Sequence, residues 1–314
     1  MQQLARLSVR CGDINLSRPA IPVSVKGRAV LPQLIVTADD FGLAWEVNEA
    51  IELAHRNGIL SAASLMVAGA AAQDAIRRAG ALPHLRVGLH LTLVEAKPML
   101  PPEQIPRLVD GRGSLRKDLA RLGLELAISP SARAQMRAEI EAQFAAFHRT
   151  GLVLDHVNLH KHYHLHPVVA REVISACRHF GARALRIPFE PRTVLRLIAA
   201  EPVEPLSPAV TALTAWLRGR VRAAGLLGPD AVFGVCWSGQ VTTERLSKLL
   251  QHLPCGIVEI YTHPASENVF EGSAAGYRYR DELEALCAPE VLRQMTRIGL
   301  ASIGYSDLAG TAFS

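Results

Sequence analysis

Short apolar runs alternate with helical patterns along most of this chain, and that alternation is what most limits the folds available to it. The runs predicted as strands are 34–37, 59–67, 87–93, 184–187, 232–236 and 257–262. Strands separated by helices pair in parallel within an α/β sheet. Their number favours an incomplete or distorted (β/α) TIM-like barrel over an open sheet.

Helical segments fill most of the intervals between these runs, because apolar residues recur there at i, i+3, i+4 and i+7. The helices expected are 47–57, one that ends at Gly80, 131–150 and 167–180. Proline at residue 167 suits the first turn of a helix, and glycine at 58, 151 and 181 suits the position after a last turn. The stretch 97–129 contains proline and glycine and is predicted to be a loop or lid.

Two segments depart from the alternating pattern. Residues 1–30 lack any period and have the composition of disordered segments, so we expect an N-terminal extension outside the fold. Residues 31–314 are expected to form one domain with a basic amphipathic helical insertion at about 192–227. That insertion either lies on a membrane or clasps a lipid, or it is an ordinary helical excursion with a solvated arginine face.

Charge and cysteine content narrow the classes of partner and compartment. The net charge of +5 comes mostly from dispersed arginines, and no run combines basic with aromatic residues, so no nucleic-acid partner is expected. Five scattered cysteines without CxxC spacing are typical of a reduced cytosolic protein. No signal peptide or membrane span is apparent. We expect a cytoplasmic protein in peripheral contact with the anionic inner membrane, and the sequence does not indicate an oligomeric state.

The densest chemical signal is the stretch 152–167, which holds five of the twelve histidines. Its alternation predicts a strand entering a loop, with Asn158 and the histidines on one face as a ladder of imidazoles. Imidazole is a common metal ligand and exchanges protons near neutral pH. The alternative is a surface histidine run without a role, but its place between a strand and a helix favours the rim of a pocket.

Further polar residues follow other predicted strands, at Asp39-Asp40, His90 and His263. Alone, the aspartate pair suits a helix N-cap, His90 an interior position and His263 a turn. Together with the histidine block they lie at the carboxyl ends of strands, where active sites of parallel α/β folds form. One carboxylate and two imidazoles on a divalent ion leave positions open for water, with the second carboxylate free to act as a base. Two imidazoles favour Zn²⁺ and leave Mg²⁺, Mn²⁺ and Co²⁺ open.

Four motifs resemble the YdjC/ChbG family of carbohydrate deacetylases: TADDFGL at 37–43, GLHLTL at 88–93, DHVNLHKHYH at 155–164 and EIYTHP at 259–264. The resemblance implies a distorted (β/α) barrel, a divalent metal and removal of acetyl groups from N-acetylated sugars. It also implies that the metal ligands are Asp40, His90 and His160. Asp39 would be the base that takes a proton from the attacking water, and His263 the acid that protonates the leaving amine.

Other residues are expected to contact the substrate or to support the metal ligands: Asn158, His162, His164 and Arg186. His162 and His164 match further histidines of the family. Family members often read Asp-Ser-His where this chain reads Asn158-Leu159-His160, so the support for His160 is expected to differ.

Within the family, the chain is most similar to the hopanoid-biosynthesis branch called HpnK. This implies deacetylation of an N-acetylglucosaminyl group on a bacteriohopanetetrol lipid. The alternatives are a deacetylase of soluble chitooligosaccharides and a histidine-rich metal-binding module without enzymatic activity. A metal phosphoesterase is disfavoured because the chain has no glycine-rich phosphate loop.

Overall fold

The computed structural model describes residues 24–25, 28–29 and 31–310. Two short antiparallel strands, β1 (Ser24–Val25) and β2 (Arg28–Ala29), precede the main sheet. The rest of the predicted N-terminal extension at 1–30 lies outside the described residues.

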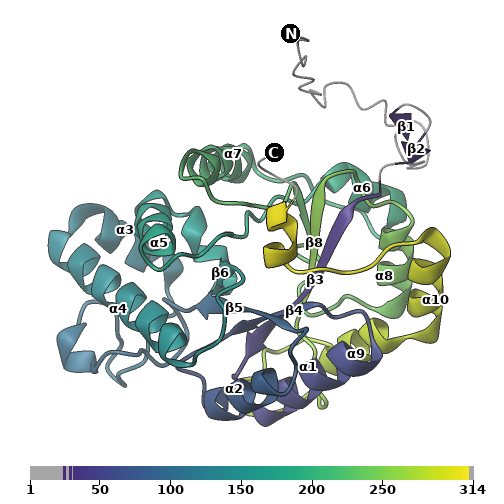
Figure 1. Cartoon of the computed structure of the whole chain (residues 1–314). Coiled ribbons are helices and arrows are strands. Elements are labelled where there is room, and N and C mark those ends of the chain that lie inside the picture. Colours follow the sequence, from purple (N-terminus) through teal and green to yellow (C-terminus); the bar gives the residue numbers. More distant parts are fainter. Residues whose placement is uncertain (1–23, 26–27, 30, 311–314) are drawn as a thin grey trace, which may run out of the picture.

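The core of the protein is a six-stranded, fully parallel sheet that curls into a half-barrel surrounded by helices (Figure 1). Its strand order is β6-β5-β4-β3-β8-β7. The strands are β3 (Gln33–Phe41), β4 (Ala62–Leu65), β5 (Arg86–Leu91), β6 (Val157–Leu159), β7 (Ala231–Phe233) and β8 (Ile257–Thr262). The predicted incomplete (β/α) barrel is confirmed, and β3 lies at its centre between β4 and β8.

The barrel is left open where a further strand was predicted at 184–187. There the chain makes only isolated bridges, from Leu185 to Val157 and from Ala184 to Leu227. Pro188 follows directly, and proline cannot donate the amide hydrogen bond that would extend the ladder. The prediction of a strand at this position is therefore wrong, although the segment still crosses the barrel and carries Arg186.

Helices cover the outside of the sheet, and the four that were predicted end within one residue of the predicted positions: α1 (Trp45–Asn57), α2 (Ala72–Gly80), α4 (Pro130–Arg149) and α5 (Pro167–His179). The helices that close the fold are α8 (Thr243–Leu250), α9 (Tyr279–Cys287) and α10 (Pro289–Ile298). Three short 3₁₀ segments complete the chain: η1 (Pro102–Gln104), η2 (His160–Leu165) and η3 (Tyr305–Gly310). Among the described residues, none of the helices is long and apolar enough to span a bilayer.

The predicted loop at 97–129 contains a helix that the composition concealed. Helix α3 (Leu119–Ile128) begins where the Asp118 side chain accepts a hydrogen bond from the amide of Arg121 at 3.0 Å. Leu122 and Leu126, one turn apart, are buried against the rest of the fold. A loop was predicted because Gly123 and the surrounding glycines and prolines were given more weight than the capping residue Asp118.

The predicted ladder of imidazoles does not form. Strand β6 ends at Leu159, and the chain then turns through Lys161 (φ 54°) and His162 (φ 52°), both in the left-handed region. In an extended strand, alternate side chains would lie on one face. After this turn the histidine rings point in different directions. The five rings have different neighbours: Asp155 for His156, His90 for His160, Tyr261 for His162, the Arg186 carbonyl for His164 and Tyr163 for His166.

The insertion at 192–227 forms two helices, α6 (Arg192–Ile198) and α7 (Pro208–Ala223). Their apolar positions Leu195, Ile198, Leu217 and Val221 are buried in the protein. Arg220 and Arg222 of α7 are exposed, as are Leu197 and Trp216. Arg218 is half-buried, with its guanidinium 4.6 Å from the centre of the Phe189 ring, and it donates to the Asp230 carbonyl at 2.9 Å.

Candidate metal centre

A local irregularity at the end of β3 places two adjacent carboxylates in one site. In a regular strand Asp39 and Asp40 would point to opposite faces. The pairing of β3 with β4 shifts register between Ala38 and Phe41, and Asp40 has a left-handed backbone (φ 63°). Aspartate tolerates this conformation better than most residues do. Both side chains are consequently buried at the carboxyl end of the sheet.

Asp40, His90 and His160 converge there from β3, β5 and the end of β6. The Asp40 Oδ1 atom lies 3.2 Å from His90 Nε2 and 3.5 Å from His160 Nδ1. The two imidazole nitrogens are 3.3 Å apart. Across the described residues, this is the one group of three or more such side chains with donor atoms close enough to share an ion.

The donor set suits a divalent cation. Asp40 Oδ1 is buried and has no hydrogen-bond partner, so it needs a cation or a proton to offset its burial. Zinc bonds of 2.0–2.1 Å in a regular tetrahedron imply donor separations of about 3.3 Å, which is the size of this triangle. One carboxylate and two imidazoles also leave coordination positions free for water and substrate.

Asn158 fixes the orientation of the His90 ring. Its Oδ1 atom lies 2.8 Å from His90 Nδ1, so that nitrogen carries the proton and Nε2 keeps its lone pair for a metal. The Asn158 amide nitrogen donates to Asp39 at 2.8 Å and to Ser64 at 3.1 Å. Asn158 therefore supports His90 and Asp39, whereas its motif position suggested support for His160. Ser64, which also contacts Asp39 at 3.0 Å, was not identified from the sequence, because a serine in an apolar strand is an ordinary residue.

Replacing Asn158 with alanine is expected to weaken metal binding by about 10–100-fold, because His90 loses the acceptor that sets its tautomer. Metal content after dialysis against a graded chelator series measures the effect. Ser64→Ala is the matched control, since it removes a weaker contact to the same ring at 3.2 Å. Equal metal affinity in wild type and Asn158→Ala would show that the ring is held by its packing alone.

Asp39 is held by a buried arginine. Arg186 Nη1 donates to Asp39 Oδ2 at 2.6 Å and Nη2 donates to Oδ1 at 2.9 Å, a two-pronged pair. Burial raises the pKa of Asp39, but the Arg186 guanidinium, together with His90 and His263, outweighs burial and brings the pKa well below the usual range of an aspartate. Asp39 is therefore ionised, and the sequence-predicted Arg186 contacts this carboxylate within the barrel.

Arg186 is itself shared with a second carboxylate. Its Nη2 and Nε atoms donate to Glu259 on β8 at 2.8 and 3.1 Å. Glu259 also accepts hydrogen bonds from Thr37 at 2.8 Å and from the Tyr305 hydroxyl of η3 at 2.7 Å. Glu259 and Tyr305 were not predicted as site residues. Two signals were available for Glu259: it is a charged residue inside the apolar run 257–262, and it begins the motif EIYTHP. Its partners are more than forty residues away in sequence.

His263 lies at the end of β8 with its ring among Tyr261 and Tyr277, at centroid distances of 5.6 and 5.1 Å. Its Nδ1 atom is buried without a hydrogen-bond partner, and its backbone amide donates to Glu282. Burial lowers the pKa of His263, although the Asp40 and Asp39 carboxylates act in the opposite direction. The imidazole is thus close enough to both aspartates to feel their charge.

The two remaining predicted histidines are placed differently. His162 Nε2 lies 3.1 Å from the Tyr261 hydroxyl, at the wall of the site. His164 is fully buried, and its Nε2 donates to the backbone carbonyl of Arg186 at 2.8 Å. His164 has no route to a substrate, and it fixes the segment that carries Arg186.

The burial of His164 makes stability depend on pH. The pKa of His164 lies at about 4, below its usual value of 6.5, because burial and the Arg186 guanidinium lower it by more than the hydrogen bond to the Arg186 carbonyl raises it. The unfolded chain binds this proton first, so stability falls as pH drops from 6.5 to about 4, by about 3 kcal/mol. His164→Gln keeps a donor for the carbonyl and removes the titration. Urea unfolding at pH 7 and pH 4 is expected to show a smaller loss for this variant, and equal losses would contradict the assignment.

A family model described as YdjC-like protein matches residues 33–297, which include Asp39, Asp40, His90, His160, Arg186 and His263. The chain belongs to the YdjC-like protein family. The carbohydrate deacetylase of Brevibacillus brevis is 28% identical over 282 residues, covering 88% of this chain and 99% of the relative. The human carbohydrate deacetylase is 27% identical over 299 residues, covering 88% and 91%.

A solved structure gives the same fold. A protein from Enterococcus faecalis, described as a proposed cellobiose-phosphate cleavage protein, superposes with a TM-score of 0.68. The two chains are 24% identical, and the match covers 88% of this chain and 98% of the other. The two proteins therefore share the half-barrel fold over most of this chain.

Proposed function

We propose that this YdjC-like protein is a metal-dependent deacetylase that hydrolyses the acetamide group of an N-acetylated sugar. The observation that carries the proposal is the triangle formed by Asp40, His90 and His160, with an ionised aspartate and an imidazole beside it. Its relatives are named carbohydrate deacetylases, which supports the same reaction class.

Each residue of the site has a separate role in amide hydrolysis. A divalent ion held by Asp40, His90 and His160 would polarise the acetyl carbonyl and acidify water. Asp39 accepts the proton of the attacking water, and Arg186 orients this carboxylate and keeps it ionised. His263 delivers a proton to the departing amine. We propose Zn²⁺ as the ion, because two imidazoles and the donor spacing suit it.

We propose an N-acetylglucosaminyl hopanoid as the substrate, handled by a cytoplasmic enzyme at the inner membrane surface. The motif resemblance to the hopanoid branch supports this choice. Two exposed apolar side chains near the site support it further: Trp45 (58% exposed) follows β3 and Val269 (86% exposed) lies in the loop after β8. The amide of Ser266 donates to the carbonyl of Glu46 at 2.9 Å, so these two segments are neighbours.

Acetate release tests the proposal. The zinc-reconstituted protein is assayed with detergent-solubilised N-acetylglucosaminyl bacteriohopanetetrol and, separately, with diacetylchitobiose. Turnover on the lipid well above that on the disaccharide is expected. Turnover on the disaccharide alone would keep the deacetylase and overturn the hopanoid assignment. Activity on neither substrate, with full zinc content, would refute both.

The two exposed apolar side chains Trp45 and Val269, which we call the apolar rim, give a sharper test of the lipid substrate. Trp45→Ala with Val269→Ser is expected to lower turnover on the lipid several-fold and leave turnover on diacetylchitobiose unchanged. Ile128→Ala on α3, also exposed, is the matched control. An equal loss on both substrates would show that the two side chains support the fold of the rim and do not contact a lipid.

A further inference from the structure

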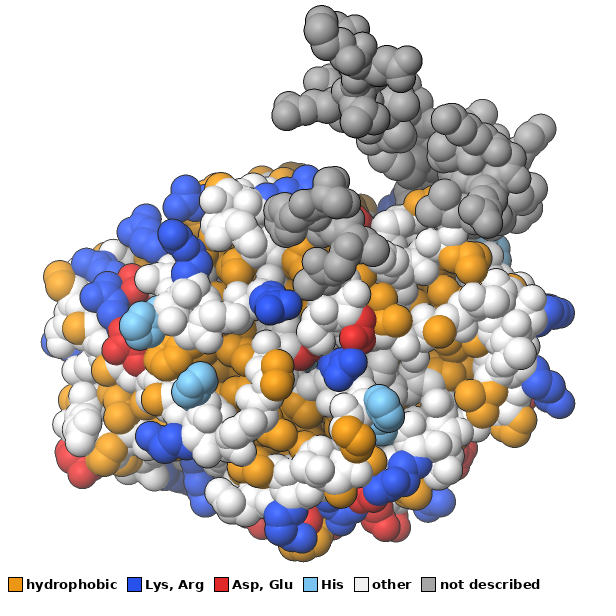
Figure 2. All heavy atoms as spheres, viewed as in Figure 1, with side chains coloured by type: hydrophobic (Ala, Val, Ile, Leu, Met, Phe, Trp, Pro, Cys, Tyr) orange, Lys and Arg blue, Asp and Glu red, His pale blue; other side chains and the backbone are white. Residues whose placement is uncertain are grey.

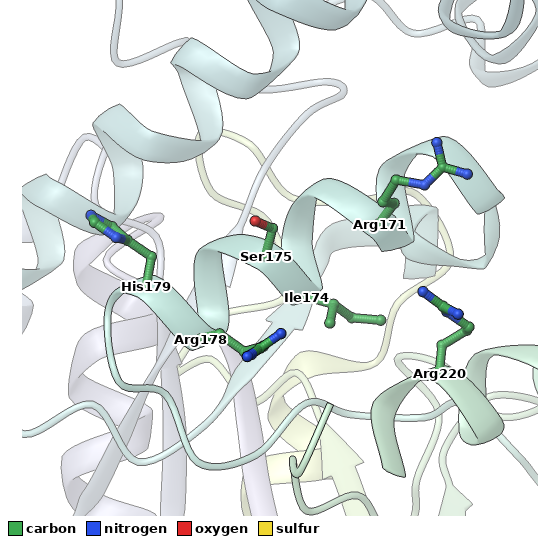
Figure 3. A pocket seen from close by; sticks show the side chains of 6 residues that line it. All are labelled: Arg171, Ile174, Ser175, Arg178, His179 and Arg220. Atoms are coloured by element: carbon green, nitrogen blue, oxygen red, sulfur yellow. The ribbon is translucent and has the colours of Figure 1, made fainter. Parts of the chain in front are cut away.

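A second feature lies outside the barrel, in the hollow between α5 and α7. Its volume is about 430 Å³ and it is open to solvent. The lining side chains come from both helices: Arg171, Ile174, Ser175, Arg178, His179 and Arg220 (Figure 3). Trp216 lines the adjoining part of the same hollow. Lys and Arg side chains gather at the upper left of Figure 2, over the region where α5 and α7 lie in Figure 1.

The helical spacing places three of these side chains on one face of α5, because Arg171, Ile174 and Arg178 are three and four residues apart. Arg220 approaches Ile174 from α7, and Trp216 lies one turn before it. Three arginines therefore line a hollow that also includes an isoleucine and an indole ring that is 38% exposed.

The three guanidinium groups are not neutralised within the described part of the chain. The side chains of Arg171, Arg178 and Arg220 are exposed and make no ion pair or hydrogen bond there. Helix α7 contains no acidic residue, and the only one on α5, Glu172, pairs with Arg137 on α4 at 2.7 Å. Like charges held around a hollow repel one another, and a bound anion removes that cost.

We propose that this hollow binds a phosphate-bearing anion, with Arg171, Arg178 and Arg220 as its ligands. The planar fork of guanidinium matches two oxygens of a phosphate group, which makes arginine the preferred residue for such recognition. Arg171 and Arg178 are seven residues apart, so their backbones are separated by about 10 Å along the helix. Side chains attached that far apart suit a ligand with more than one anionic group. This site is separate from the proposed deacetylase centre and does not depend on it.

Calorimetric titration with inorganic pyrophosphate tests the site. Wild-type protein is expected to bind about one equivalent, and Arg171→Gln with Arg220→Gln to bind at least about tenfold more weakly. The matched control is Arg293→Gln, an exposed arginine on α10 far from the hollow, which should leave binding unchanged. Thermal melting confirms that each variant is folded. Binding of equal strength in all three proteins would overturn the proposal.

Vesicles distinguish a free phosphate compound from a lipid headgroup as the source of the anion. Sedimentation with phosphatidylglycerol vesicles and with phosphatidylcholine vesicles is compared for the same three proteins. Retention on phosphatidylglycerol alone, lost with the two arginines, identifies the headgroup as the ligand. Pyrophosphate binding without vesicle retention identifies a soluble anion. If neither probe binds in an arginine-dependent way, the site does not exist.

Discussion

Asp39→Asn is expected to lower turnover about 10²–10⁴-fold while the protein keeps its metal, because the variant loses a general base and no metal ligand. The asparagine oxygen still accepts a hydrogen bond from Arg186, so the barrel is expected to remain folded. Acetate release at saturating substrate measures the loss, and elemental analysis of the same preparation measures the metal.

Asp40→Asn is the matched control for this experiment. Asparagine, like aspartate, tolerates the left-handed backbone conformation of Asp40. Neither variant is therefore expected to strain the backbone. Asp40→Asn is expected to lose metal and turnover together. If Asp39→Asn also lost its metal, Asp39 would belong to the ligand set and its assignment as a separate base would be wrong.

Arg186→Met is expected to lower the free energy of unfolding by at least about 3–5 kcal/mol, the range for breaking a buried ion pair. Two buried carboxylates, Asp39 and Glu259, lose their common cation in this variant. A loss of that size is a large part of the stability of an ordinary domain. Urea unfolding monitored by circular dichroism gives the value.

Arg186→Lys serves as the companion variant. It keeps a positive charge and loses the fork that holds both carboxylates, so a smaller stability loss is expected than for methionine. Turnover is expected to fall in both variants, because Asp39 is no longer oriented. Full stability in Arg186→Met would show that the two carboxylates are protonated in the folded protein and need no cation.

The sequence predicted the part of the site that depends on strand ends. Asp40, His90 and His160 follow three different strands of a parallel sheet, and the carboxyl ends of such strands meet at one edge. The apolar runs and helix caps likewise indicated the barrel. These features are local, so one sequence is enough to find them.

The contacts that orient the site were harder to predict because they depend on register and turn geometry. The bulge that turns Asp40 inward and the left-handed pair at 161–162 are backbone conformations without a composition signal. Asn158 bonds His90 across the β5–β6 pairing, in which the two residues are direct partners. Arg186 reaches Glu259 only because the chain crosses the open side of the barrel.

The order of strands in the sheet has a consequence for how the protein is made. β3 pairs on one side with β4, which follows at once, and on the other with β8, about 220 residues later, as in Thr37 with Tyr261. A ribosome adding 5–20 residues per second takes about 10–40 s to deliver that second neighbour. During this interval the central strand has an unpaired edge, which exposes it to aggregation and to chaperones. The same delay applies to Tyr305 and Glu259, so the carboxylate of Asp39 is fully positioned only when nearly the whole chain has left the ribosome.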